Sequence, residues 1–409
     1  MAYPLIPSVF LMDIAANGAS SIIDSQPNLL KYLEVYLNGG TNPGGYKYPG
    51  FFHEMNPKLA GGDWSVAWGP CVYSLIDGLP ATNAMYVAFS PKLATYVVCI
   101  AATNPISIYD WVMEDGNVDP HLMAPWPPKL PFQIVKRNPP IPTTTPAISA
   151  ATALGISDLL TQAEMVDAKT GQDMQSFLTA KTDANTTLIF AGHSLAGALS
   201  PTLAYYLYPT PATSGWKTVL VLPSAGATPG NAAYAAGFNA AYPQTIDGSS
   251  GLAWNTDFAN RHDVVPHAWD KLKEVTHGFT THFNVRSIWG VLKGGDVKSI
   301  GIAVWAALNS ASVLAGTYYT AIRQQWVRPD WGYWAWTATY PPTWTRLPVY
   351  TDNAPLSTVE ELGDMIDATH IDQYFNFFGV VPAPKMSVPK LKLKVGAIDM
   401  TAGSVQADG

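Results

Sequence analysis

Apolar residues follow two alternating patterns along most of the chain. Short apolar runs bounded by turn residues are typical of buried strands, whereas apolar positions spaced three and four apart are typical of helices. Before residue 64 a single helical pattern, at 27–37, precedes a loop rich in glycine and proline. Beyond it, the pattern predicts strands at 64–68, 84–90, 94–102, 186–192 and 217–225, a further strand leading into 260–266, and helices at 156–181, 195–207 and 232–240.

The order of these elements indicates an α/β fold. The runs at 84–90 and 94–102 are separated by little more than Pro91 and Lys92, which predicts a hairpin. The later strands are almost wholly apolar and alternate with helices, which is typical of a largely parallel sheet covered on both faces. We therefore expect a central, mostly parallel sheet flanked by helices.

Three segments depart from this alternation. Residues 116–147 are so rich in proline that they predict an irregular loop or flap. Residues 299–322 carry no charge, but polar residues and Gly316 dilute the apolar run, which favours a buried or interfacial helix over a membrane span. The third segment, 331–344, contains Trp331, Trp334, Trp336 and Trp344. These tryptophans indicate either aromatic packing or an apolar surface that meets lipid or an acyl chain.

The composition narrows the class of function. Of the 409 residues, 48% are hydrophobic and 13% are charged, and the net charge is −7. A chain of this length can bury a large core. It contains no cluster of basic residues, which argues against a nucleic-acid partner.

The first residues and the cysteines bear on the compartment. The first apolar run is broken by Pro7 and Asp13 and lacks a basic start, so we expect no signal peptide, and both a secreted mature form and a cytoplasmic location stay open. Cys71 and Cys99 stand in strand-like apolar surroundings. We expect buried thiols there rather than a disulfide.

The segment 188–200, LIFAGHSLAGALS, carries the candidate nucleophile, Ser194. A serine hydroxyl becomes a nucleophile when a sharp strand-to-helix turn presents it and a base takes its proton. Such a turn needs small residues two positions before and two positions after the serine. Gly192 supplies the first, and Ala196 adds only one methyl group at the second. Since an apolar strand precedes Ser194 and a small-residue helix follows it, we predict that Gly192, His193 and Ala196 form a nucleophile elbow around Ser194.

A catalytic triad also needs an acid, which follows the serine in this type of fold. Asp263 comes after a strand-like run, and the carboxyl ends of parallel strands are where open α/β sheets build their sites. Asp247 and Asp257 are alternatives. We expect Asp263 to be the acid.

The triad base must be a histidine beyond the acid in chain order. His370 lies near the end of the folded portion, where a loop can return over the sheet, and it is the expected base. His277 and His282 are rivals, whereas His193 is expected to point away from Ser194. Two further histidines flank Asp263 too closely to be its separate partner, namely His262 and His267.

Five segments, in the right order, resemble the class 3 (fungal-type) lipase family. GHSLAGAL resembles that family's GHSLGGAL, and residues 224–239 resemble the stretch FGAPRVGNxxFAxxFN. NRHDVVPHAW resembles the N-x-x-D-x-V-P-x-L element that carries the catalytic Asp, and THIDQYF resembles the H-x-x-Y element that carries the catalytic His. Residues 99–115 resemble FRGTxSxxDWxxD, the segment that supplies an oxyanion residue.

The resemblance implies an α/β-hydrolase fold with a triad of Ser194, Asp263 and His370. It places Thr103 and the backbone N–H of Leu195 in the oxyanion hole, although Ala101 and Ala102 replace the family's Arg-Gly before that threonine. The interval between Asp263 and His370 is long for the family. We therefore expect an N-terminal extension at 1–63, a lipase domain at 64–380 with a cap-like insertion at about 285–350, and a tail at 381–409.

The resemblance also implies a function, a serine carboxyl-ester hydrolase that cleaves acylglycerols or related fatty-acyl esters without metal or organic cofactor. Its partners would be a lipid or ester substrate and, transiently, a lipid interface, and the proline-rich segment lies where the family has its lid. A short-chain esterase, a phospholipase A and an acyltransferase would use the same triad. A non-catalytic lipid-binding protein of this fold is the alternative from another class. The oligomeric state stays open.

Overall fold

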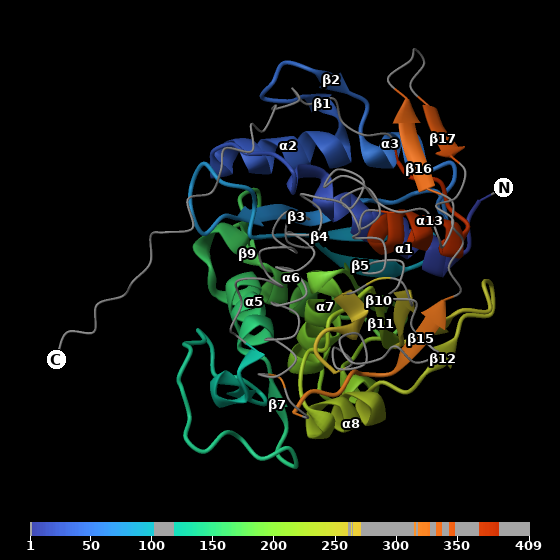
Figure 1. Cartoon of the computed structure of the whole chain (residues 1–409). Coiled ribbons are helices and arrows are strands. Elements are labelled where there is room, and N and C mark those ends of the chain that lie inside the picture. Colours follow the sequence, from blue (N-terminus) through green and yellow to red (C-terminus); the bar gives the residue numbers. More distant parts are fainter. Residues whose placement is uncertain are drawn as a thin grey trace, which may run out of the picture.

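The computed structural model describes residues 2–101, 118–260, 263, 265–270, 315, 318–327 and 368–383, together with the backbone of 333–337 and 343–347. Its centre is a seven-stranded sheet in the order β15-β14-β11-β10-β5-β4-β3 (Figure 1). From β15 to β5 neighbouring strands run parallel, and β4 and β3 join antiparallel. The strands are β3 (Ser65–Tyr73), β4 (Asn83–Ser90), β5 (Thr95–Ile100), β10 (Thr187–His193), β11 (Thr218–Ser224), β14 (Asp257–Asn260) and β15 (Gln324–Val327).

Side chains of the central strands alternate between two apolar layers, as the two-residue period of a strand requires. In β10, Ile189 and Ala191 face one layer, whereas Leu188 and Phe190 face the other. The first layer is closed by α1 (Leu5–Ala15), α2 (Gln26–Asn38), α3 (Phe51–Met55) and α13 (Gln373–Phe378). The second is closed by α5 (Ala150–Thr161), α6 (Met174–Lys181), α7 (Leu195–Leu207) and α8 (Ala232–Ala241) (Figure 1). The chain thus has an α/β fold with helices on both faces of a mostly parallel sheet.

Within the described residues, five two-stranded ribbons lie outside the central sheet. They are β1 (Gly40–Thr41) with β2 (Lys47–Tyr48), β6 (Ala124–Pro125) with β7 (Ala147–Ile148), β8 (Val166–Asp167) with β9 (Gln172–Asp173), β12 (Thr245–Ile246) with β13 (Ala253–Trp254), and β16 (Tyr333–Thr337) with β17 (Thr343–Leu347). β6 and β7 close the base of the proline-rich loop, and the Trp126 ring stacks on Tyr205 of α7 with centroids 5.0 Å apart. The loop is therefore tied to the core at its base.

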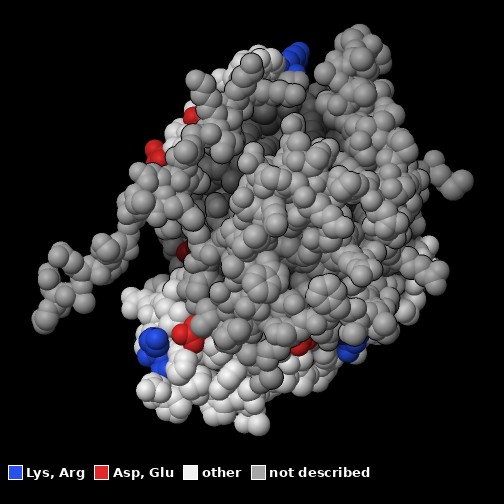
Figure 2. Space-filling view, viewed as in Figure 1, with Lys and Arg blue, Asp and Glu red and all other residues white. Residues whose placement is uncertain are grey.

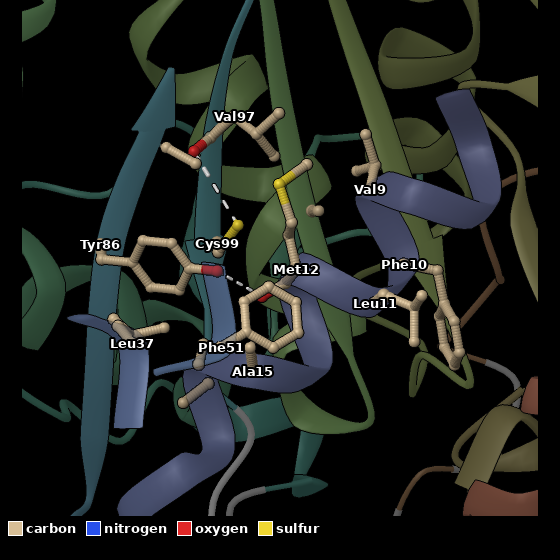
Figure 3. Close-up of a cluster of buried hydrophobic side chains, with 14 of the residues drawn as sticks. Val9, Phe10, Leu11, Met12, Ala15, Leu37, Phe51, Tyr86, Val97 and Cys99 are labelled. Carbon is tan, nitrogen blue, oxygen red and sulfur yellow. Dashed lines mark hydrogen bonds between the residues drawn. The ribbon is translucent and has the colours of Figure 1, made fainter. Parts of the chain in front are cut away.

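The first helix, α1, lies in the core rather than on the surface. Every residue from Ile6 to Asp13 is buried, and Tyr86 of β4 donates a hydrogen bond of 2.6 Å to the carbonyl of Met12 (Figure 3). A helix that is apolar all round shows no helical periodicity, so no periodic pattern predicted α1. Pro7 does not interrupt α1 because proline is tolerated in the first turn of a helix.

Most of the predicted elements exist, and one prediction is wrong. The hairpin of β4 and β5, the helix at 27–37 and the strand–helix units around β10 and β11 are confirmed. The single helix expected at 156–181 is instead two helices, α5 and α6, separated by the β8–β9 hairpin. That hairpin turns at Gly171, whose φ of +68° favours glycine, and the Gly171 N–H donates to the Asp167 carbonyl at 2.8 Å. Such a turn interrupts the helical backbone even where the spacing of apolar residues predicts one continuous helix.

Other expectations fall largely outside the described residues. The apolar segment 299–322 is described only at 315, which is helical, and at 318–322, where Tyr319 forms a strand-like bridge with Asn231. The predicted cap at about 285–350 is described only in part, and Gln324–Val327 within it form the edge strand β15. The division into domains stays a prediction. Within the described residues no helix is long and apolar enough to cross a membrane. Cys71 and Cys99 are both buried and free of disulfides, as expected.

Candidate active site

Ser194 stands on a sharp turn between β10 and α7. Its backbone has φ of +64° and ψ of −127°, a conformation that a serine rarely adopts and that marks a strained turn. The Ser194 N–H donates to the Ser224 carbonyl at 3.0 Å, and the Ser194 carbonyl accepts from the Gly197 N–H at 2.8 Å. The turn is therefore fixed from both sides, and the hydroxyl is presented at the carboxyl end of the sheet.

Close backbone contacts decide which positions of the elbow must be glycine. A Cβ on Gly192 would lie 2.0 Å from the Ala196 carbonyl oxygen, and a Cβ on Gly197 would lie 2.6 Å from the Gly226 Cα. Both positions are too crowded for a side chain. The methyl group of Ala196 instead packs into the apolar layer with α5 and α7 and is fully buried. The departure from G-x-S-x-G therefore falls at a position with room for a methyl group.

His370 links Ser194 to Asp263. The His370 Nε2 atom lies 2.8 Å from the Ser194 Oγ, and its Nδ1 atom lies 2.7 Å from the Asp263 Oδ2. All three side chains are buried, at 2%, 2% and 1% exposure. Because a carboxylate only accepts, Nδ1 carries the proton and Nε2 accepts from the Ser194 hydroxyl. The structure thus brings together the three residues that the sequence pointed to, in the arrangement of a nucleophile, a base and an orienting acid.

Backbone and tyrosine donors hold the Asp263 carboxylate. The Val265 N–H donates to Oδ1 at 3.0 Å, and the Tyr374 hydroxyl donates to Oδ2 at 3.1 Å. The Tyr374 hydroxyl in turn accepts from the Asn260 N–H at 2.9 Å. Burial, and then the negative charge of Asp263, raise the pKa of Tyr374, so the phenol stays protonated and can donate.

The segment that carries His370 is a π-helical turn, Ala368–Asp372, which runs into α13. The chain has three residues between His370 and Tyr374, one more than the H-x-x-Y element that it resembles. A π-helical turn is wider than an α-helical turn and absorbs one extra residue. As a result His370 and Tyr374 reach the same Asp263 Oδ2 oxygen although they are four positions apart.

Asn260 anchors this turn to the end of β14. Its side-chain nitrogen, Nδ2, donates to the Thr369 carbonyl at 2.7 Å and to the Gln373 side chain at 2.5 Å. The family element around Asp263 begins with this asparagine, so a sequence signal for its importance existed. Its contact with the histidine segment, however, is visible only in the folded chain.

His193 points away from Ser194, as expected, but it joins the site through two other hydrogen bonds. Its Nε2 atom lies 2.8 Å from the His370 carbonyl oxygen and its Nδ1 atom lies 2.9 Å from the Ser224 Oγ. The two imidazole rings are 5.0 Å apart between centroids. Elbow geometry does direct the His193 side chain to the opposite side of the strand from Ser194, but the segment at 368–372 folds around to meet it there.

The alternatives for the acid and the base lie elsewhere. Asp257 accepts from the Gly226 N–H and from Gln324, and Asp247 accepts from Ser249 and Ser250 in a partly exposed turn. The His267 Nδ1 atom contacts the Asp263 carbonyl at 2.6 Å. The rivals His262, His277 and His282 lie outside the described residues, as do Ala102 and Thr103.

Half of the predicted oxyanion hole can be located. Leu195 is the first residue of α7, so its N–H stands at the positive end of the helix beside Ser194. Ala101, which precedes the undescribed oxyanion segment, donates from its N–H to the Ala84 carbonyl at 2.8 Å. The strand that leads to the predicted oxyanion segment, β5, therefore ends at the same edge of the sheet as Ser194.

The described residues show neither a metal-binding cluster nor a surface patch of one charge on the face in Figure 2. Among the described residues no group of three histidine, cysteine or acidic side chains is placed to hold a metal ion. On the described part of the face in Figure 2, the visible charged side chains are scattered and of both signs.

Comparison with known proteins identifies the central segment. Residues 132–280, which include Ser194 and Asp263, match the lipase (class 3) family. This part of the chain is similar to the class 3 lipases. The match supports a lipase-type ester hydrolase with a lipid or ester substrate. No curated protein matches the chain.

One solved structure agrees with the fold of this chain. The crystal structure of M37 lipase is similar with a TM-score of 0.61 at 20% identity, over 94% of this chain and 96% of that one. A mutant form of MDLA from Penicillium cyclopium gives a TM-score of 0.42 at 14% identity, over 89% of this chain and 93% of that one. The Rhizomucor miehei lipase propeptide complex gives 0.40 at 12% identity, over 80% and 72%. Only the first similarity is close enough to bear on the fold, which is that of an α/β-hydrolase.

Proposed function

We propose that this protein is a serine carboxyl-ester hydrolase that cleaves fatty-acyl esters through an acyl-enzyme. The observation that carries the proposal is the buried hydrogen-bonded chain Asp263–His370–Ser194, with contacts of 2.7 and 2.8 Å. A buried serine bonded to a histidine whose other nitrogen is held by a carboxylate has the geometry that nucleophilic catalysis requires. The class 3 lipase match supports the proposed substrate class, an ester with a fatty-acyl chain.

In the first half of the reaction, the Ser194 Oγ attacks the ester carbonyl carbon while His370 Nε2 takes the hydroxyl proton. Asp263 stabilises the imidazolium that forms and keeps Nδ1 protonated and in place. The tetrahedral intermediate collapses when His370 gives its proton to the departing alcohol. Ser194 is then acylated. In the second half, water gives a proton to His370 and attacks the acyl-enzyme, which releases the fatty acid and restores the Ser194 hydroxyl.

The negative oxygen of each intermediate needs donors that are already in place. The Leu195 N–H, at the start of α7, is one of these donors in our proposal. Thr103 is the second, on the strength of the resemblance of residues 99–115 to the family's oxyanion segment. Replacing Thr103 by alanine should lower kcat by about 10²–10³-fold if its hydroxyl donates, and by less if only its N–H does.

The decisive experiment compares the native protein with Ser194→Ala on p-nitrophenyl esters of increasing chain length and on emulsified triglyceride. Removal of the nucleophile should lower kcat by roughly 10⁴-fold or more. Unchanged hydrolysis in Ser194→Ala would refute the mechanism. Absence of hydrolysis in the native protein, with lipid binding retained, would favour the non-catalytic alternative.

The same assay separates the rival activities. Activity confined to short, soluble esters indicates an esterase. Release of fatty acid from phospholipid vesicles indicates a phospholipase A, and transfer to an added alcohol in place of water indicates an acyltransferase. The proline-rich loop at 120–147 is proposed as the lid, because Ile134 and Val135 within it are exposed apolar residues and the class 3 resemblance places the lid there. Limited proteolysis of that loop with and without lipid tests this role.

A further inference from the structure

His193 is a buried titratable group that the proposed reaction does not use. It is the residue directly before the nucleophile, it is 3% exposed, and it is enclosed by three aromatic contacts. Phe10 from α1 approaches its ring edge-on at 6.0 Å, Tyr374 approaches edge-on at 5.0 Å, and the His370 ring lies 5.0 Å away. A buried polar ring in such surroundings must have its hydrogen bonds satisfied, or it would destabilise the fold.

The two hydrogen-bond partners of His193 fix its protonation state. A backbone carbonyl can only accept, so the Nε2 atom that lies 2.8 Å from the His370 carbonyl carries the hydrogen. Burial, and then the proximity of His370, lower the pKa of His193, so the ring is neutral and Nδ1 has a free lone pair. The Ser224 hydroxyl, 2.9 Å away, then donates to Nδ1. His193 is held in one tautomer and donates to one carbonyl.

This carbonyl belongs to the residue that must take the proton of Ser194. The bond spans 177 positions of sequence and joins the nucleophile elbow directly to the main chain of the base. Ser224 is part of the same link, since its carbonyl accepts from the Ser194 N–H at 3.0 Å while its hydroxyl supports His193. Ser194 and His370 are therefore linked by one short chain of contacts, in addition to the Asn260 bonds that anchor the His370 segment.

We infer that His193 is a positioning residue, whose neutral ring holds the backbone of His370 at the distance from Ser194 that proton transfer requires. The inference rests on the proposed function. Loss of the bond leaves the fold and the substrate-binding surface in place but lets the His370 segment move away from Ser194. A misplacement of this kind lowers the rate of acylation much more than it weakens substrate binding.

Two substitutions of nearly equal size separate this role from a merely structural one. Glutamine places an amide nitrogen near the position of the histidine Nε2, so His193→Gln can still donate to the His370 carbonyl. Asparagine places its amide near the position of Nδ1, so His193→Asn can bond to Ser224 but does not reach His370. We expect His193→Gln to keep kcat within about threefold of the native value. We expect His193→Asn to lower kcat by roughly tenfold or more with KM little changed, because one hydrogen bond of typical net strength is lost.

Labelling of Ser194 by a fluorophosphonate gives a second measurement that needs no substrate. Its rate should fall in His193→Asn and recover in His193→Gln. Equal kcat and equal labelling in the two folded variants would overturn the inference, and so would a change in KM alone. If both variants unfold, Ser224→Ala decides, since it removes only the support at Nδ1. It must lower the labelling rate, and a native rate would overturn the inference.

The controls separate this inference from the proposed function. Native protein and Ser194→Ala are assayed in parallel, and their thermal midpoints are measured by circular dichroism. If native protein hydrolyses esters and Ser194→Ala does not, the proposed function stands whatever His193 does. If native protein and Ser194→Ala behave alike, it is the proposed function that fails.

Discussion

Tyr374 donates its hydroxyl to the same Asp263 Oδ2 oxygen that accepts from His370. The phenol also accepts from the Asn260 N–H, so it joins the end of β14 to Asp263, the proposed acid. A carboxylate held by several donors keeps one orientation, and a hydrogen bond to a charged group is stronger than one between neutral groups. Tyr374 therefore holds the Asp263 carboxylate in the orientation in which its Oδ2 atom accepts from His370.

Tyr374→Phe should weaken both catalysis and stability. The buried Asn260 N–H loses its acceptor and Asp263 loses one donor, which should cost about 2–3 kcal/mol of unfolding free energy. We expect kcat to fall by roughly tenfold with little change in KM. Urea denaturation and ester hydrolysis measure the two effects.

Tyr234→Phe is the matched control for that substitution. The Tyr234 hydroxyl donates to the Thr202 hydroxyl at 2.9 Å in the layer on the other face of the sheet. This variant should lose stability and keep kcat. If Tyr374→Phe behaves in the same way, its phenol has no part in holding Asp263 for catalysis.

Asp13 should make the folded state less stable as pH rises. It is 1% exposed in α1, its Oδ1 has no hydrogen-bond partner among the described residues, and burial raises its pKa well above the ordinary value of 3.8. Below that value the carboxyl is protonated in both folded and unfolded chains. At higher pH the unfolded chain ionises while the folded chain retains the proton, so unfolding becomes more favourable until the folded pKa is passed.

Asp13→Asn replaces the carboxyl by a neutral group of the same shape and removes this linkage. We expect the difference in thermal midpoint, variant minus native protein, to become more positive from pH 4 to pH 8. Asp183→Asn removes one negative charge at an exposed position and serves as the control. A difference between Asp13→Asn and native protein that does not depend on pH would show that Asp13 is ionised in the fold.

Phe10 connects the N-terminal helix to the segment that carries the triad histidine. Its ring stacks on Phe378 at 4.4 Å and meets Phe375 edge-on at 5.4 Å, both on α13. Phe10→Ala should cost about 3–5 kcal/mol, because a buried phenyl group is removed and a cavity remains. Phe10→Leu should cost less, since most of the volume is kept. Equal unfolding midpoints for native protein and Phe10→Ala would show that α1 does not hold α13 in place.

The sequence predicted the site better where the chemistry is local than where it depends on distant contacts. The limits of α7 and the turn at Ser194 followed from an apolar strand that runs into small residues. The wholly buried helix α1 left no periodic signal, and the β8–β9 hairpin was hidden inside an apparently helical pattern. The contacts of His193 and of Tyr374 depend on where the segment at 368–378 returns to the sheet, which no local pattern contains.

The two small positions of the elbow should respond in opposite ways to a change of one methyl group. Gly192→Ala places a Cβ 2.0 Å from the Ala196 carbonyl oxygen, a contact that only backbone displacement relieves, so we expect loss of activity and of soluble protein. Ala196→Gly removes a fully buried methyl group and adds a flexible residue to the first turn of α7. It should cost about 1–2 kcal/mol and keep the activity, because the turn at Ser194 does not depend on that methyl group. Expression yield, unfolding midpoint and ester hydrolysis of the two variants test this. An inactive but stable Ala196→Gly would mean that the methyl group itself sets the position of Ser194.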